Sequence, residues 1–331
     1  MSETPRKAAK FSTTPRIVAC PDSLKGVLSA WQAATCLRTG FVNAGVECEV
    51  MPLADGGEGT GDALEIALGG EWQLAYEVPD PIGRTRTTRF LLLPDGRAVV
   101  ESAAAIGLTL LAQEERDPLR ATSKGLGVLI RAAVDAGATG LIVGLGGTAT
   151  VDGGAGLREV VQELPVPTSA LCDVRSPLLD AARVFAAQKG ASPEQVEELE
   201  RRLAGMDELG PHAELPGAGA AGGLGAALAA LGAQLVPGAE FILSAVGLRE
   251  RLRGSALAVT GEGTVDRTSA EGKVAGAVVR LCAQEGIRCA VFGGRVEEPL
   301  PDAESYELSG DPERAREDLV ALGERLARSV V

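Results

Sequence analysis

The sequence predicts an α/β protein in which a second α/β domain is inserted into a domain built on a parallel sheet. Short apolar runs end in glycine-rich loops that carry carboxylates at residues 48–60, 141–156 and 257–266, as expected of buried strands that open onto loops. Near Glu71 the apolar runs expected of parallel strands give way to the alternating pattern of an antiparallel hairpin, and the parallel pattern returns near the C-terminus. A chain of 331 residues is also long for one core, which favours two domains.

The first elements form a strand–helix–strand unit. The first strand is expected to end near Cys20, and Ser29 is expected to cap a helix that runs to about Phe41. Gly45 ends this helix before the second strand, CEVMPL, begins. Because ligands bind at the carboxyl ends of parallel strands, residues that follow these strands are candidates for a site.

The middle of the chain predicts a different sheet. From Glu71, alternating residues and a Pro-Asp-Gly turn predict an antiparallel hairpin. A helix and strand follow over 123–147, a short strand ends at Asp173, and a surface helix spans 192–206. Residues 217–236 are expected to form a glycine loop that leads into a tightly packed helix.

The end of the chain returns to the parallel style. Strands are predicted over 255–266 and 286–296 on either side of a helix, and a closing helix is predicted within 311–331. The expected units are a disordered tail at 1–15, a parallel-sheet domain formed by 16–70 and 250–331, and an inserted domain at 71–249. The tail lacks the apolar core of a signal peptide.

Composition limits the partners. The net charge of −13 argues against nucleic acid and against an anionic membrane surface, because both require a basic face. No segment is apolar and long enough to predict a membrane span. The six cysteines form no CxxC pair, so we interpret them as small buried residues in a reducing cytoplasm.

The lysines and carboxylates indicate a site for a phosphorylated anion. Four of the six lysines adjoin a glycine, namely Lys25, Lys124, Lys189 and Lys273, and we expect phosphate or substrate contact above all from Lys25 and Lys273. The alternative is that they are solvated loop lysines. His212 is the single histidine, so acid–base work falls to carboxylates, for which the loops offer Asp152 and Glu262 among others. Phosphoryl transfer requires loop amides, lysine and carboxylates, and all are present.

Nine segments resemble the bacterial type I glycerate kinases in order and spacing across about residues 16–294. They are PDSLKGVLSA, PLADGGEGTGDAL, ESAAAIGL, TSKGLGVLI, VGLGGTATVDGGAGL, CDVRSPL, AQKGA, GAGAAGGLGAAL and GEGTVDRTSAEGK. The resemblance implies a discontinuous flavodoxin-like domain with a second α/β domain inserted, and an active site between them. It also implies phosphorylation of D-glycerate by ATP with Mg²⁺, with 2-phosphoglycerate the favoured product.

The parts that phosphoryl transfer requires suggest roles for the loop residues. Asp173, at the end of a short strand, is expected to be the proton acceptor, with a structural bond to the following turn as the alternative. The expected catalytic residues are Asp173, Lys25 and Asp266. The expected substrate or phosphate contacts are Asp22, Ser23, Gly56, Gly57, Gly146, Gly147, Thr148 and Lys273. The expected metal ligands are Asp55 and Glu58.

Three departures from the family pattern keep a second hypothesis open. Val151 replaces an amide residue, while Thr264 and Arg267 change the GEGRxDxQ pattern. The alternative is a catalytically weakened relative that binds a sugar acid or nucleotide without turnover. The sequence is compatible with a homodimer. It does not decide whether the 2-hydroxyl or the 3-hydroxyl of glycerate is phosphorylated.

Overall fold

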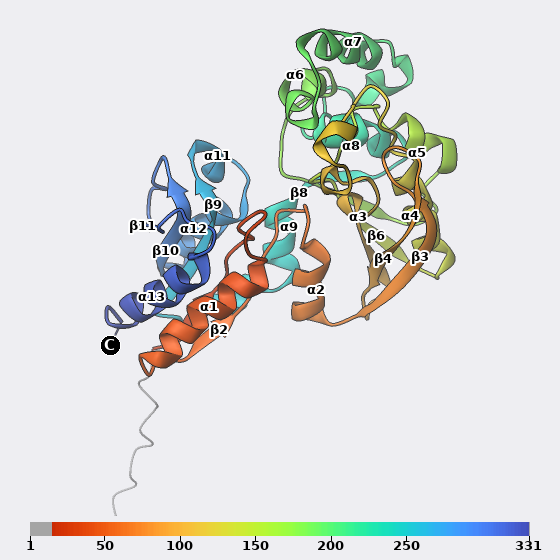
Figure 1. Ribbon diagram of the computed structural model, residues 1–331. Helices are drawn as coiled ribbons and strands as arrows, with labels where there is room; N and C mark the ends of the chain where they lie inside the picture. Colours follow the sequence, from red (N-terminus) through yellow and green to blue (C-terminus); the bar gives the residue numbers. More distant parts are fainter. Residues whose placement is uncertain (1–14, 331) are drawn as a thin grey trace, which may run out of the picture.

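The computed structural model describes residues 15–330 and contains two β-sheets (Figure 1). The first sheet is parallel, with strand order β11-β10-β9-β1-β2. In chain order this is 2-1-3-4-5, the flavodoxin-like order, so the flavodoxin-like prediction is confirmed. Its strands are β1 (Ile17–Ala19), β2 (Cys48–Val50), β9 (Leu257–Val265), β10 (Arg288–Val296) and β11 (Glu304–Glu307).

Helices cover both faces of the first sheet because its strands alternate between two apolar clusters. Ile17 and Ala19 pack in a cluster with α1 (Ala30–Asn43) and α13 (Ala315–Ala327). Val18 packs in another cluster, with α12 (Val274–Glu285). Ser29 caps α1 in a capping box with Gln32, as expected, although the helix continues two residues beyond Phe41.

The second sheet lies between β2 and β9 in the chain and has strand order β3-β4-β5-β6-β7-β8. The β3–β4 and β4–β5 pairs are antiparallel, which confirms the predicted hairpin, and the later pairs are parallel. The strands are β3 (Glu71–Pro79), β4 (Thr85–Leu92), β5 (Arg97–Glu101), β6 (Gly140–Gly144), β7 (Thr168–Cys172) and β8 (Gln234–Pro237).

Short helices surround this second sheet. They are α3 (Ser102–Ile106), α4 (Lys124–Asp135), α5 (Ala155–Val160), α6 (Ala181–Phe185), α7 (Pro193–Ala204) and α8 (Ala220–Ala230). The 3₁₀ turns are η1 (Leu108–Leu110), η2 (Gln113–Glu115), η3 (Leu178–Asp180), η4 (Ala187–Lys189) and η5 (Asp207–His212). One prediction is corrected: residues 234–236 form β8 beside β7 and do not continue the glycine-rich helix.

The two sheets share one apolar cluster. Helices α2 (Thr60–Leu68) and α9 (Gly238–Ala245) lie between the two sheets in Figure 1, and α10 (Leu248–Leu252) adds Leu248 and Leu252 to the same cluster. Leu64 and Ile242 pack in a cluster that contains Val18 of the first sheet and Leu171 of the second. The inserted α/β architecture is therefore confirmed, whereas the boundaries at 70/71 and 249/250 stay predictions.

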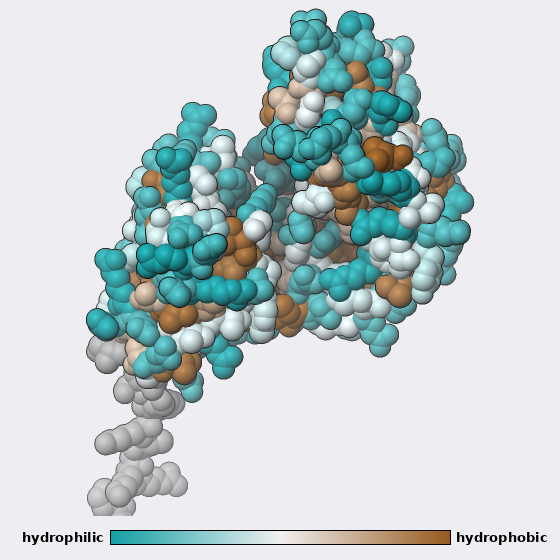
Figure 2. All heavy atoms as spheres, viewed as in Figure 1, coloured by the Kyte–Doolittle hydropathy of each residue, from teal (hydrophilic) through white to brown (hydrophobic). Residues whose placement is uncertain are grey.

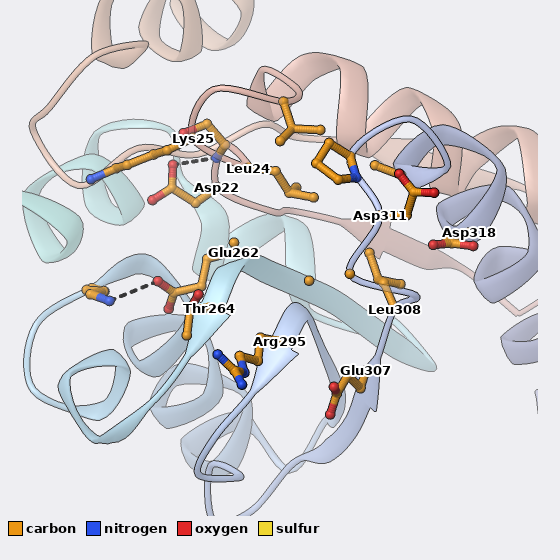
Figure 3. A pocket seen from close by; sticks show the side chains of 18 of the residues that line it. Asp22, Leu24, Lys25, Glu262, Thr264, Arg295, Glu307, Leu308, Asp311 and Asp318 are labelled. Carbon is orange, nitrogen blue, oxygen red and sulfur yellow. Dashed lines mark hydrogen bonds and ion pairs between the residues drawn. The ribbon is translucent and has the colours of Figure 1, made fainter. Parts of the chain in front are cut away.

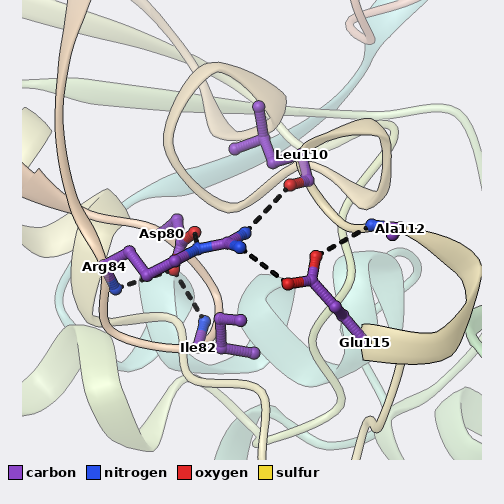
Figure 4. A network of polar contacts seen from close by, with 6 residues as sticks. All are labelled: Asp80, Ile82, Arg84, Leu110, Ala112 and Glu115. Carbon is purple, nitrogen blue, oxygen red and sulfur yellow. Dashed lines mark hydrogen bonds and ion pairs between the residues drawn. The ribbon is translucent and has the colours of Figure 1, made fainter.

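A polar network holds the hairpin turn of the second sheet against the segment that follows α3 (Figure 4). The Arg84 guanidinium donates to Asp80 Oδ2 at 2.6 Å, to Glu115 Oε1 at 2.7 Å and to the Leu110 carbonyl at 3.2 Å. The other Glu115 oxygen accepts from the Ala112 amide at 3.0 Å. The network fixes the outer edge of this lobe.

The surface in view is hydrophilic, with scattered apolar side chains and a recess between the two lobes (Figure 2). Among residues 15–330, no helix has the length and apolar content to cross a bilayer. All six cysteines are buried and unpaired, as expected of small apolar residues. Residues 1–14 of the predicted tail lie outside the described residues.

Candidate active site

The candidate site lies at the carboxyl edge of the first sheet. In a 2-1-3-4-5 sheet the strand order reverses between β1 and β9, and ligands bind in the crevice outside this point. A cavity of about 660 Å³, here called the edge cavity, occupies that position (Figure 3). It is lined by residues that follow or end all five strands, among them Asp22, Lys25, Asp55, Glu262, Lys273 and Leu308.

The loop after β1 contributes Asp22, Ser23 and Lys25. The Asp22 amide donates to the Gly261 carbonyl at 2.9 Å, which keeps the loop beside β9, and its carboxylate accepts from the Ser23 amide at 2.6 Å. Burial, together with the negative charge of Asp55, raises the pKa of Asp22. Desolvation would lower the pKa of Lys25, but Asp55, Asp22 and Asp173 together raise it.

The loop after β2 carries the buried carboxylate of Asp55, which accepts from the Gly57 amide at 2.9 Å. A Cβ on Gly56 would lie 2.6 Å from the Leu171 Cβ, and one on Gly146 would lie 2.5 Å from the Gly57 Cα. The Gly146 amide approaches the Gly56 carbonyl at 3.4 Å. These three glycines therefore let the loops of the two sheets pack against each other, a role that the sequence did not distinguish from phosphate binding.

The end of β9 pairs Glu262 with Lys273. The Lys273 Nζ lies 3.1 Å from Glu262 Oε2 and 3.8 Å from Asp266 Oδ1. Burial raises the pKa of Glu262, and its Oε1 is buried with no hydrogen-bond partner among the described residues. Glu262 was noted in the sequence only as a loop carboxylate, and its role in the site became visible only with Lys273 opposite it.

Asp266 caps the short helix α11 (Arg267–Ala270). Its carboxylate accepts from the Thr268 amide at 2.7 Å, the Thr268 hydroxyl at 2.5 Å and the Ser269 amide at 3.2 Å. The hydrogen bond from the Thr268 hydroxyl lowers the pKa of Asp266. These contacts orient the turn that carries Lys273, so the geometry supports a structural use of Asp266 at the rim of the site.

Asp173 joins the site from the second sheet. It directly follows β7 and lines an adjoining cavity of about 640 Å³. Burial, then the charge of Asp55, raises the pKa of Asp173, while Lys25 and Lys273 oppose the shift. A Cβ on Gly272, which precedes Lys273, would lie 3.3 Å from the Asp173 carbonyl oxygen, so the end of β7 lies beside the turn that carries Lys273.

Glu58 is not brought to this cluster. Whereas Asp55 lines the edge cavity, Glu58 lines another cavity, beside β4 and α3. There it adds negative charge beside Glu101, whose pKa rises to about 7 mainly through burial. Asp55 and Glu58 therefore do not face each other as two ligands of one metal ion would. Residues 56 and 57, which separate them in the chain, pack against Leu171 of β7 and against Gly146, which follows β6.

Gly147 and Thr148 lie apart from the edge cavity. The Gly147 carbonyl accepts from the Leu108 amide at 2.8 Å. The Thr148 hydroxyl accepts from the Lys189 Nζ at 3.1 Å, and the same ammonium donates to the Thr150 carbonyl at 2.8 Å. Lys189 is therefore a buried lysine that holds the loop after β6 by hydrogen bonds. The Lys-Gly pair in the sequence did not predict this structural role.

Two other candidates from the loops are structural or solvated. The Asp152 carboxylate accepts from the Ser123 amide and hydroxyl, both at 2.8 Å, and from the amides of Gly154 and Gly156. Lys124 forms an exposed ion pair with Glu159 at 3.2 Å.

The candidate site is therefore formed by residues from both sheets. They are Asp22, Ser23, Lys25, Asp55, Asp173, Glu262 and Lys273.

Comparisons with known proteins agree with this architecture. The model of the glycerate kinase family matches residues 17–167 and 160–310. The chain is 38% identical to the glycerate 2-kinase of Escherichia coli K12, covering 78% of this chain and 80% of that protein. It is 36% identical to a glycerate kinase of Halalkalibacterium halodurans, covering 84% and 85%. The crystal structure of a Salmonella typhimurium LT2 protein provisionally named glycerate kinase 2 superposes with a TM-score of 0.80 at 32% identity, covering 96% and 98%.

The buried ammonium of Lys189 predicts a pH-dependent stability. Burial lowers the pKa of Lys189 to about 7, with Asp152 opposing the shift. Between about pH 7 and the pKa of an exposed lysine, this side chain binds a proton in the unfolded chain but not in the folded one. The free energy of unfolding therefore rises with pH, by up to ~1.4 kcal/mol per pH unit. In urea unfolding from pH 6 to 10, Lys189→Met should lack this rise and Lys124→Met should keep it. A pH-independent difference between wild type and Lys189→Met would contradict the assignment.

Proposed function

The chain belongs to the glycerate kinase family, and from this premise we propose that it transfers the γ-phosphoryl group of ATP to the 2-hydroxyl of D-glycerate with the help of Mg²⁺. The family supplies glycerate as the acceptor. The similarity to the Escherichia coli glycerate 2-kinase supports the 2-hydroxyl over the 3-hydroxyl. The observation that carries the proposal is the lysine–carboxylate cluster where the edges of the two sheets meet.

The two lysines of the cluster suit the phosphates. Lys25 and Lys273 both line the edge cavity, from the loop after β1 and the start of α12 respectively. Phosphoryl transfer spreads negative charge over the transferring group, and positioned ammonium groups stabilise that charge. Desolvation opposes the charge of Lys25, but Asp55 and Asp22 raise its pKa, and a contact of 3.1 Å with Glu262 positions the Lys273 side chain.

The carboxylates fit Mg²⁺ as a partner of the phosphates. Among residues 15–330, no three His, Cys, Asp or Glu side chains converge as a preformed metal cage. Mg²⁺ commonly uses only one or two carboxylates and takes its other ligands from water and phosphates. Asp22 and Asp55 would hold it, since both carboxylates are buried at the edge cavity. Burial and then the charge of Asp55 raise the pKa of Asp22, and a bound cation would offset both effects. Bound there, the ion would neutralise phosphate charge.

Asp173 is the proposed proton acceptor for the glycerate hydroxyl. It stands on the second-sheet side of the cluster, across from the phosphate-binding lysines, and its raised pKa makes it a stronger base than an exposed aspartate. Asp266 is less suited because its Oδ1 accepts three hydrogen bonds from the turn that it caps and because the Thr268 hydroxyl lowers its pKa. Asp173 therefore takes the proton while Asp22 and Asp55 serve the metal.

The family departures give little support to a non-catalytic binding protein. Val151 is buried in the core of the second domain, so its side chain is a packing residue. Arg267 is exposed and lies 3.9 Å from Glu271. Thr264 lines the edge cavity, but a hydroxyl there keeps the wall polar.

The direct test is a coupled assay for ADP release with purified protein, ATP, Mg²⁺ and D-glycerate, with NMR to identify the phosphorylated hydroxyl. We expect 2-phosphoglycerate and full loss of turnover in excess EDTA, restored by added Mg²⁺, because the carboxylate-rich cavity would otherwise repel ATP. ADP release that survives EDTA would refute the metal requirement, and 3-phosphoglycerate would refute the proposed acceptor hydroxyl.

Replacing either cluster lysine should impair catalysis without unfolding the protein. Lys25→Ala and Lys273→Ala should each lower kcat/KM for ATP by a factor on the order of 100, because each removes a cation from the transition state. Lys124→Ala is the matched control, since its exposed ion pair contributes little. If all three variants matched wild type, Lys25 and Lys273 would be ordinary surface lysines.

Removing the proposed base should separate binding from turnover. Asp173→Asn keeps the shape of the side chain but cannot accept the proton, so kcat should fall by roughly 100- to 10,000-fold while ATP and glycerate still bind. The control is Asp180→Asn, which alters only an exposed pair with Arg183. Wild-type kcat in Asp173→Asn would assign the proton to another group, and joint loss of binding and melting temperature would make Asp173 structural.

A further inference from the structure

The two ends of the edge cavity differ in charge. Figure 3 shows Lys25 near Asp22 and Glu262 at one end, and Leu308 with Glu307, Asp311 and Asp318 at the other. Lys25 and Lys273 belong to the first end, where Lys273 lies 3.1 Å from Glu262, whereas Arg295, the third basic residue of the lining, is exposed and lies 3.7 Å from Glu297. Phosphate groups would be repelled by the carboxylates of the second end. A nucleotide in this cavity therefore has one favourable direction.

Gly263 of β9 and Gly294 of β10 lie side by side in the lining and are here called the floor of the cavity. Close packing explains the glycine at 294 but not the one at 263. Gly294 must be a glycine, because a Cβ there would lie 2.9 Å from the Gly263 carbonyl oxygen. Gly263 has no such constraint: the nearest heavy atom to a Cβ would be the Lys25 amide nitrogen at 3.9 Å, and its φ lies outside the left-handed region. Glycine weakens a strand interior, and where its neighbours leave room it marks close approach of a ligand to the backbone.

Apolar residues border this floor. Leu24 and Val27 come from the loop after β1, while Leu308 and Pro312 come from the segment after β11. A cavity of about 660 Å³ is within the usual range for small-molecule sites, and an apolar wall with few polar groups is their usual chemistry. A flat heterocycle is the part of ATP that suits such a wall.

We propose that the edge cavity holds the nucleoside half of ATP, with the adenine lying over the backbone at Gly263 and Gly294 toward Leu308, and the phosphates directed to Lys25 and Lys273. The ribose then lies beside Glu307, whose carboxylate has no hydrogen bond or ion pair among the described residues and accepts from a ribose hydroxyl. This inference rests on the proposed use of ATP and adds where the nucleoside binds.

The test narrows the floor and follows binding separately from turnover. Gly263→Val adds branched carbon over the floor in a residue type that strands favour. Gly205→Val is the matched control, because a Cβ at Gly205 would meet only helix carbonyls at 3.5 and 3.6 Å, in the other lobe. Calorimetry without glycerate gives the Kd for ADP, and inorganic tripolyphosphate serves as the competitor that lacks a nucleoside.

We expect Gly263→Val to raise the Kd for ADP at least tenfold and Gly263→Ala to raise it by less. The affinity for tripolyphosphate, measured by its competition with ADP, should stay close to that of wild type and Gly205→Val. The melting temperature should also stay close to theirs. Unchanged ADP affinity in both Gly263 variants would overturn the location. An equal loss for ADP and tripolyphosphate would place phosphates over Gly263 and overturn the orientation.

Failure of the proposed function would be visible in the wild type alone. Wild type that binds ADP without phosphorylating glycerate would refute the proposed reaction while leaving the nucleoside site to be judged by the Gly263 variants. Wild type that binds neither ADP nor ATP would refute both proposals. If Gly263→Val does not fold, Gly263→Ala alone decides, since one methyl group meets no atom closer than 3.9 Å.

Discussion

The candidate site depends on the close packing of two segments, residues 54–57 after β2 and residues 144–147, which begin at the last residue of β6. A Cβ at Gly144 would lie 2.4 Å from the Gly56 carbonyl oxygen, and one at Gly238 would lie 1.8 Å from the Asp55 carbonyl oxygen. Only backbone fits between these segments. This contact brings the carboxyl edge of one sheet against that of the other, and it places Asp55 where it couples electrostatically to residues of both sheets.

The electrostatic arrangement is unfavourable for the protein alone. Burial and then the charge of the nearby Asp55 raise the pKa of Asp22, and Glu262 leaves one oxygen buried without a partner among the described residues. Uncompensated buried charge reduces stability, and such clusters are characteristic of functional sites. Lys25 and Lys273 compensate part of this charge. A cation and an anionic ligand together would complete the compensation, which is consistent with phosphoryl transfer.

The shared apolar cluster explains how such a site is maintained. Leu64 of α2 and Ile242 of α9 pack in the cluster that includes strands of both sheets, so the lobes are joined by a hydrophobic core as well as by the chain. Burial of apolar surface is the dominant favourable term in folding. It can offset the repulsion within the carboxylate cluster. Farther from the site, the buried Lys189 and the half-buried Asp152 fix the loop that follows β6 through hydrogen bonds with its backbone.

The sequence by itself determined the features that depend on local pattern. Apolar runs and turn residues predicted β1, β9, the antiparallel hairpin and the cap of α1, because periodicity and capping involve residues close in the chain. The ordered motifs also indicated the family. Only the tertiary structure distinguished the uses of similar residues: Asp55 faces the edge cavity while Glu58 faces another, Asp266 caps a helix, and Gly56 makes room for Leu171. Each of these uses is set by a partner distant in the chain or by the direction of a loop, which local pattern does not encode.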